Sequence, residues 1–211
     1  MKKSLLLLLP LLLLTACGGL GSTGTTDNRT VLDDQSEIPS VTETATKPDV
    51  PEGALVDESG DFVFTGKLQQ IGDDENGYIQ VPLGYVPFQE EGVEGLTQYS
   101  DVTGTNIFTL EHYDGLSYQT AAENMRAYVQ QDETVEDVQG ATVQIAGNPA
   151  LQLYGRYTDG IFIVIWFIED PVDTSSSYYL AIEFDAEHTD IVACSSTFQT
   201  VDTFHASETE S

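Results

Sequence analysis

Basic residues are scarce in this sequence. It contains seven Lys and Arg against 35 Asp and Glu, which gives a formal net charge of −28. Binding to nucleic acid needs clustered positive charge, and so does attraction to anionic lipid headgroups. The composition therefore argues against a nucleic-acid partner and favours a soluble, self-repelling surface. A cationic ligand or Ca²⁺ is a partner class that this charge leaves open.

Residues that carry catalytic chemistry are also few. The sequence has two cysteines, Cys17 and Cys194, and three histidines that stand far apart, His112, His188 and His205. It contains no Gly-x-Ser-x-Gly nucleophile turn, phosphate loop or dinucleotide-binding fingerprint. We therefore predict a protein that is not an enzyme, with no cofactor, no metal site and no catalytic residue. The alternative is an envelope hydrolase that uses acidic residues, but carboxylates are so abundant that the choice of one catalytic pair would be arbitrary.

The sequence lacks an apolar run long enough to cross a membrane. The longest, from Leu5 to Leu14, is interrupted by Pro10. It is about half the length of the roughly 20-residue helix that spans the hydrocarbon core. Because it follows Lys2 and Lys3 and ends in small residues, it is typical of a secretory signal.

The exit of this signal reads Leu14-Thr15-Ala16-Cys17. This motif resembles the lipobox of bacterial lipoproteins. The resemblance implies that residues 1–16 are a signal peptide and that the thiol of Cys17 receives the lipid. The mature protein would then be anchored to the extracytoplasmic face of the cell membrane by its acyl chains. In an ordinary secretory signal, Cys17 would be incidental.

The segment after the signal is polar and without a periodic apolar face. Residues 17–60 are rich in Gly, Ser, Thr, Asp, Glu and Pro, which predicts a disordered acidic tether. Its root-mean-square reach would be about 35 Å. We expect residues 61–205 to form the folded domain and 206–211 a polar tail. With Cys17 lipidated, Cys194 has no disulfide partner, so the domain must rely on a packed core.

The sequence of the folded part predicts seven strands and two helices. Residues 161–168 are apolar at every position, as in a strand that is covered on both faces. Residues 178–184 alternate, which places Leu180, Ile182 and Phe184 inward and Glu183 outward. The other predicted strands are 78–82, 96–99, 106–113, 142–145 and 150–157, and the helices are 117–131 and 189–203.

This order of elements predicts an α+β fold, in which an antiparallel sheet is flanked by helices as an α/β/α sandwich. The segments Gly77-Tyr-Ile-Gln-Val-Pro-Leu-Gly-Tyr85 and Ala146-Gly-Asn-Pro-Ala-Leu151, together with this order, resemble the PsbP-like superfamily. The resemblance implies a non-catalytic module that binds or helps to assemble other proteins. An envelope protein or another surface ligand is the expected partner.

Candidate binding residues gather in the first half of the domain, where the strands are short. We predict a binding surface there that uses Tyr85, Phe88, Tyr99 and Tyr113. Trp166 and Cys194 are expected in the core because they lie on apolar stretches. The run Asp73-Asp74-Glu75 does not match a Ca²⁺ loop and predicts a solvated turn.

Overall fold

The computed structural model describes residues 63–89 and 95–209, all of which belong to one compact unit, Lys47–Ser211. The predicted signal peptide (1–16) and tether (17–60) lie outside the described residues. Within the described ranges, no helix combines the length and the apolar character that a membrane span requires.

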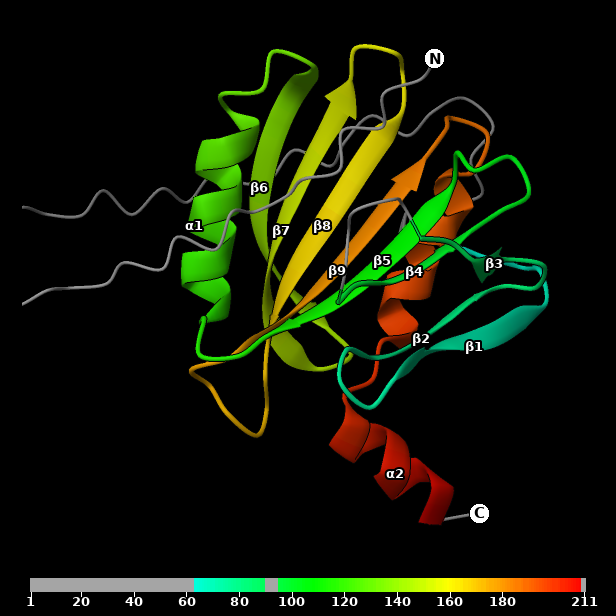
Figure 1. Cartoon of the computed structure of the whole chain (residues 1–211), viewed down its shortest axis with the longest axis vertical. Coiled ribbons are helices and arrows are strands. Elements are labelled where there is room, and N and C mark those ends of the chain that lie inside the picture. The colour runs from blue at the N-terminus through cyan, green and yellow to red at the C-terminus, as the bar shows by residue number, and fades with distance from the viewer. Residues whose placement is uncertain (1–62, 90–94, 210–211) are drawn as a thin grey trace, which may run out of the picture. The chain divides into compact units, whose positions relative to one another are not determined.

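Seven antiparallel strands form the main sheet of the domain (Figure 1). Their order across the sheet is β3 (Val86–Pro87), β4 (Thr97–Ser100), β5 (Ile107–Tyr113), β9 (Ser177–Phe184), β8 (Phe162–Glu169), β7 (Asn148–Tyr157) and β6 (Val135–Ile145). A separate hairpin joins β1 (Leu68–Asp73) to β2 (Gly77–Pro82). The meander from β6 to β9 agrees with the strand order predicted for the second half of the sequence.

Two adjacent strands of this sheet are covered on both faces. Ile163 and Val164 of β8 point to opposite faces, and each is 4% exposed, which confirms the prediction for this strand. The prediction for β9 was incomplete, because Tyr179 and Ala181 are buried as well as the residues that alternate with them. β9 lies between β5 and β8 and is therefore the middle strand of the sheet.

One face of the sheet is covered by helix α1 (Tyr118–Val129), which lies over β7, β8 and β9. The Ser117 side chain accepts a hydrogen bond from the backbone N–H of Thr120 and caps the helix, as predicted. The buried residues of α1 recur at helical spacing: Ala121, Ala122, Met125 and Val129.

The opposite face is covered by the β1–β2 hairpin and by η1 (Thr189–Thr197), a 3₁₀ helix. The sequence predicted one closing helix over 189–203. The chain instead becomes extended at Phe198, and Gln199 pairs with Tyr78 through two backbone hydrogen bonds of 2.8 Å. A second helix, α2 (Val201–Thr209), follows and extends into the segment predicted as the polar tail. The antiparallel sheet is confirmed, but an α-helix covers only one of its faces in the described part of the chain.

The sequence analysis missed one strand and placed the start of another too late. β1 was not predicted, because Leu68–Asp73 holds too few apolar residues to show a pattern. β6 begins at Val135 rather than at residue 142. A bulge between Glu136 and Gln139, with Asp137 at φ 56°, disturbs the alternation by which a strand is recognised.

Candidate binding surface and polar network

The structure places the four predicted binding residues on two faces of the sheet. Tyr85 is 8% exposed, and its ring packs edge-on against Phe108 with centroids 5.3 Å apart. Tyr99 lies opposite Phe108 on β4 and is half-buried on the same face. Tyr113 stacks with Phe167 on the other face. Phe88 follows Pro87, the partner of Tyr99, so it also belongs to that other face. The four side chains do not form one surface, and their role in binding stays a prediction.

Three exposed apolar residues of the first half lie close in sequence or pairing to Tyr85, which is itself buried. Leu83 is 62% exposed, Val86 is 49% exposed and Leu68 is 37% exposed. These three residues, together with exposed Pro87, are called the β2–β3 corner here. Leu68 pairs with Pro82, the residue before Leu83, and the N–H of Leu83 donates to the carbonyl of Lys67 at 2.8 Å. The corner therefore gathers exposed apolar residues near the open end of the hairpin.

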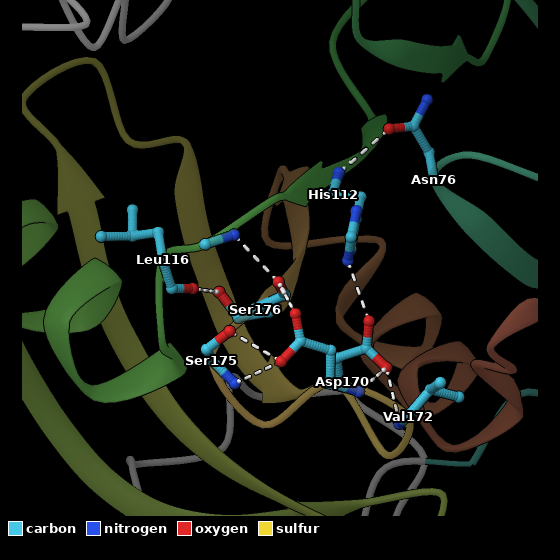
Figure 2. A network of polar contacts seen from close by, with 10 residues as sticks. Asn76, His112, Leu116, Asp170, Val172, Ser175 and Ser176 are labelled. Carbon is cyan, nitrogen blue, oxygen red and sulfur yellow. Dashed lines mark hydrogen bonds and ion pairs between the residues drawn. The ribbon is translucent and has the colours of Figure 1, made fainter. Parts of the chain in front are cut away.

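A polar network lies at the other end of the hairpin (Figure 2). The Nε2 atom of His112, on β5, is 3.0 Å from Oδ2 of Asp170, in the β8–β9 loop. The other carboxylate oxygen of Asp170 accepts the backbone N–H groups of Val172 at 2.8 Å and Asp173 at 3.3 Å. The Asp170 side chain is 8% exposed. This buried carboxylate therefore fixes both the loop that carries it and the imidazole of His112.

The network continues through the β8–β9 loop to the start of α1. The Ser176 hydroxyl donates to Oδ2 of Asp173 at 2.9 Å and accepts the N–H of Gly115 at 2.9 Å. Ser175 donates to the same carboxylate from both its hydroxyl and its backbone N–H. These hydrogen bonds lower the pKa of the Asp173 carboxyl. They hold the loop against the segment that leads into α1.

On the hairpin side, Asn76 connects His112 to the β1–β2 turn. Its Oδ1 accepts the backbone N–H of His112 at 3.0 Å, and its amide donates to Asp73 and Thr97. Burial raises the pKa of the Asp73 carboxyl, but hydrogen bonds from Thr97, Asn76 and Glu75 outweigh it and lower the pKa overall. Asp73, predicted as part of a solvated turn, therefore anchors the hairpin to β4.

The hydrogen bonds of this network hold its side chains in fixed positions. The His112 ring packs against Tyr178 with centroids 4.6 Å apart, and Asp170 is its hydrogen-bond partner among the described residues. The hydroxyls of Ser175 and Ser176 donate to Asp173 rather than to the imidazole. A nucleophile activated by His112 would have to donate its proton to that ring. The described residues therefore provide a His–Asp pair without a nucleophile in contact with it.

A compact cleft with two inward carboxyl groups whose pKa values are raised would favour the hydrolase alternative. Among the described residues, Glu111 is the carboxyl group with a raised pKa, because it is partly buried on β5. The pKa values of Asp73, Asp101 and Asp173 are lowered.

The remaining candidates from the sequence lie in the core or pair locally. Trp166 is buried, and its indole N–H donates to Oε1 of Gln152 at 2.9 Å. Cys194 is buried as predicted, and burial raises the pKa of its thiol to about 12. His188 pairs with Asp185 at 2.7 Å. The described part of the chain holds no group of three His, Cys, Asp or Glu side chains that could bind a metal ion.

Glu111 gives a prediction for the pH dependence of stability. Because burial raises its pKa in the folded protein, the folded state binds this proton more tightly than the unfolded state does. The carboxylate form therefore opposes folding at neutral pH, and this penalty disappears once the pH falls below the pKa of the unfolded chain. We expect Glu111→Gln to raise the free energy of unfolding at pH 7 and to leave it unchanged near pH 3.

Denaturant unfolding at the two pH values measures this difference. The glutamine side chain can still accept the hydrogen bond that the Tyr113 hydroxyl donates to Glu111. Glu187→Gln, at an exposed position, is the matched control and should change stability at neither pH. An equal effect of Glu111→Gln at both pH values would contradict the assigned cause.

No protein-family model and no curated protein matches this chain. Similar solved structures include the cyanobacterial PsbP (CyanoP) of Synechocystis sp. PCC 6803, which is 12% identical, with 65% of this chain and 95% of that chain covered and a TM-score of 0.47. The Ran-binding protein Mog1p of Saccharomyces cerevisiae is 12% identical over 66% of this chain and 98% of that chain, with a TM-score of 0.43. These likenesses concern the fold, and membership of the PsbP-like superfamily stays a prediction.

Proposed function

We propose that this protein is a lipid-anchored bacterial lipoprotein whose domain binds another envelope protein at the extracytoplasmic face of the cell membrane and catalyses no reaction. The Leu14-Thr15-Ala16-Cys17 motif after a leucine-rich run supports the anchor. Two or more acyl chains give stable attachment, because each buried methylene contributes about 0.8 kcal/mol. Residues 17–60 would serve as the tether between the membrane and the domain.

The β2–β3 corner is the observation that carries the binding role. Leu83 is 62% exposed and Val86 is 49% exposed, in a chain with a formal net charge of −28. A partner that covers them gains roughly 25 cal/mol for each Å² of apolar surface removed from water. The expected partner surface is apolar at its centre. It also has few acidic groups, because a net charge of −28 repels them.

Cys17→Ala tests the anchor. Alanine has no thiol to accept the diacylglyceryl group, so we expect acylation to be lost. The protein would then be released from the membrane fraction or would remain as unprocessed precursor. Mass spectrometry of the membrane fraction measures the modification. An unmodified Cys17 in membrane-attached wild-type protein would refute the anchor while leaving the binding role untouched.

The double substitution Leu83→Asp/Val86→Asp tests the binding surface. Both side chains are exposed, so the domain should stay folded, and thermal melts check this. We expect cross-linking in intact envelopes to yield an adduct with the wild-type protein that the double variant loses. Val102→Asp, at a position that is 91% exposed in the β4–β5 loop, is the matched control and should keep the adduct. An adduct of equal yield from all three proteins would place the partner elsewhere.

A further inference from the structure

Three carboxylates from distant parts of the sequence lie near one another at one end of the main sheet. Asp101 follows β4, Asp185 follows β9, and Asp190 lies in the first turn of η1; they are called the acidic cluster here. Asn106 links the first two, because its amide donates to Oδ2 of Asp101 at 2.7 Å and its Oδ1 accepts the N–H of Asp185 at 3.1 Å. Since Asn106 is fully buried, it fixes the two loops relative to each other.

The hydroxyl of Tyr85 lies within electrostatic range of all three carboxylates. Burial raises the pKa of this hydroxyl, and the charges of the acidic cluster raise it further, so the group stays protonated. Tyr85 is buried, and its hydroxyl has no hydrogen-bond partner among the described residues. Buried polar groups in folded proteins are almost always hydrogen-bonded. This hydroxyl therefore marks a position that a polar atom of a ligand would complete.

The acidic cluster keeps an excess of negative charge. Among the described residues, His188 is the one basic group that forms an ion pair with it, with Nδ1 2.7 Å from Oδ1 of Asp185. Burial raises the pKa of the Asp101 carboxyl, but hydrogen bonds from Asn106 and Thr103 outweigh burial and lower the pKa overall. A protonated His188 would balance one of the three carboxylates. A positively charged ligand would therefore meet a complementary charge here.

The acidic cluster reaches the surface, which gives a ligand access to it. Asp101, Asp185 and Asp190 are each partly exposed. The carboxylate of Asp190 makes no hydrogen bond with the described residues, so it is available to a ligand. As stated above for the described ranges, three metal-binding side chains do not come together there. The cation that suits the cluster is therefore organic.

The unpaired hydroxyl decides which organic cation fits. A primary ammonium has three N–H donors and no acceptor, so it can donate to a hydroxyl oxygen and to carboxylates at the same time. A quaternary ammonium carries the same charge without a donor and would leave the Tyr85 oxygen unpaired. The two cations therefore differ in the one interaction that this site adds to simple charge attraction.

We propose that the acidic cluster binds a primary alkylammonium group, with Oη of Tyr85 accepting one N–H and the carboxylates of Asp101 and Asp190 balancing the charge. This chemistry has two sources, which are a small free amine and the side chain of a lysine on the partner protein. The second source rests on the proposed function.

The β2–β3 corner adjoins the acidic cluster, which makes a lysine of the partner a suitable source. Tyr85 lies between Leu83 and Val86 in the sequence, and Val86 pairs with Ser100, the residue before Asp101. A lysine side chain has an apolar stem and a charged end. A partner on the corner would therefore need to extend such a side chain only a short way to reach the carboxylates.

Titration of the mature chain carrying Cys17→Ala with n-butylammonium, followed by nuclear magnetic resonance, tests the proposal. We expect saturable shifts of the Tyr85 ring and Asn106 amide signals at low salt, because salt screens the attraction. Tetramethylammonium is the control ligand and should bind at least about tenfold more weakly, since it cannot donate to Tyr85. Equal binding of the two cations, or no binding of either, overturns the proposal.

Three variants make the test specific. Tyr85→Phe removes a hydroxyl that has no partner in the free protein, so the melting temperature should not fall. Its dissociation constant for n-butylammonium should rise at least about tenfold. Asp190→Asn removes one charge and should raise the constant about threefold, whereas Glu187→Gln, at an exposed position nearby, should leave it unchanged. A Tyr85→Phe protein that binds as tightly as the wild type overturns the proposal.

The cross-linking experiment on envelopes separates the two sources once n-butylammonium is shown to bind. Loss of the adduct from the Asp190→Asn protein would assign the ammonium to a lysine of the partner, and an adduct that persists would assign it to a free amine. The proposed function is tested separately. A wild-type protein that does not bind n-butylammonium overturns this inference, even if the Leu83→Asp/Val86→Asp variant loses its adduct and so supports the corner as the binding surface.

Discussion

Ile163→Asp and Val164→Asp should each unfold the domain. The two side chains project from β8 toward opposite faces of the sheet, and each is 4% exposed. A carboxyl group at such a site must stay protonated or lose its hydration, which costs about 4–7 kcal/mol at neutral pH. A domain of this size has about 5–15 kcal/mol of stability in total, and the lost burial of the apolar side chain adds about 2–5 kcal/mol to the cost, so the sum is comparable with the whole.

Far-ultraviolet circular dichroism and denaturant melts measure the loss. Val102→Asp introduces the same group at a position that is 91% exposed and should melt like the wild-type protein. If one of the two β8 variants were as stable as this control, water would reach that face of the sheet. The layers of α1 on one side and of the hairpin with η1 on the other would then not both form in solution.

The second large effect concerns Asp170, the buried carboxylate of the polar network. Asp170→Ala leaves three groups without their acceptor: the backbone N–H groups of Val172 and Asp173, and Nε2 of His112. A buried donor that loses its partner costs about 1–3 kcal/mol, and water can reach part of this loop. We expect the free energy of unfolding to fall by about 2–4 kcal/mol.

The conservative variant separates lost hydrogen bonds from lost volume. Asp170→Asn keeps a carbonyl oxygen for the N–H of Val172, so we expect less than half of the destabilisation seen with alanine. Asp114→Ala, at an exposed position near the same end of the sheet, should have no measurable effect. A loss of equal size in the alanine and asparagine variants would mean that the carboxylate's hydrogen bonds do not hold this loop.

The sequence predicted well those elements whose own residues show a clear strand or helix pattern of apolar positions. β8 is apolar at every position, and α1 combines helical spacing with a serine cap, so both were found close to their bounds. β9 looked like a strand with one buried face because Glu183 interrupts its apolar residues. Its central place depends on pairing with β5, which is separated from it by α1 and three strands. The apolar pattern of a strand does not indicate which strands pair with it.

The closing helix and the candidate surface were harder to predict, because they too depend on contacts between segments that are distant in sequence. The stripe of Ile191, Cys194 and Phe198 predicts a helix, but pairing between Gln199 and Tyr78 ends the helical backbone there. The polar network was missed because His112 and Asp170 are distant in sequence and meet only when β5 and β9 pair. The aromatic residues of the first half led to the prediction of a binding surface there, which stays a prediction. The fold decided that Tyr85 is buried and Leu83 exposed.

The place of β9 has a consequence for how the chain folds as it is made. β3, β4 and β5 form one half of the sheet and β6, β7 and β8 the other, and residues 177–184 join the two. Until these residues are available, β5 and β8 are open apolar edges that have nothing to pair with. A chain that emerges from its N-terminus therefore cannot close its core until its C-terminal strand arrives. A protein delivered across a membrane as an extended chain would remain unfolded during passage and would fold once β9 is released.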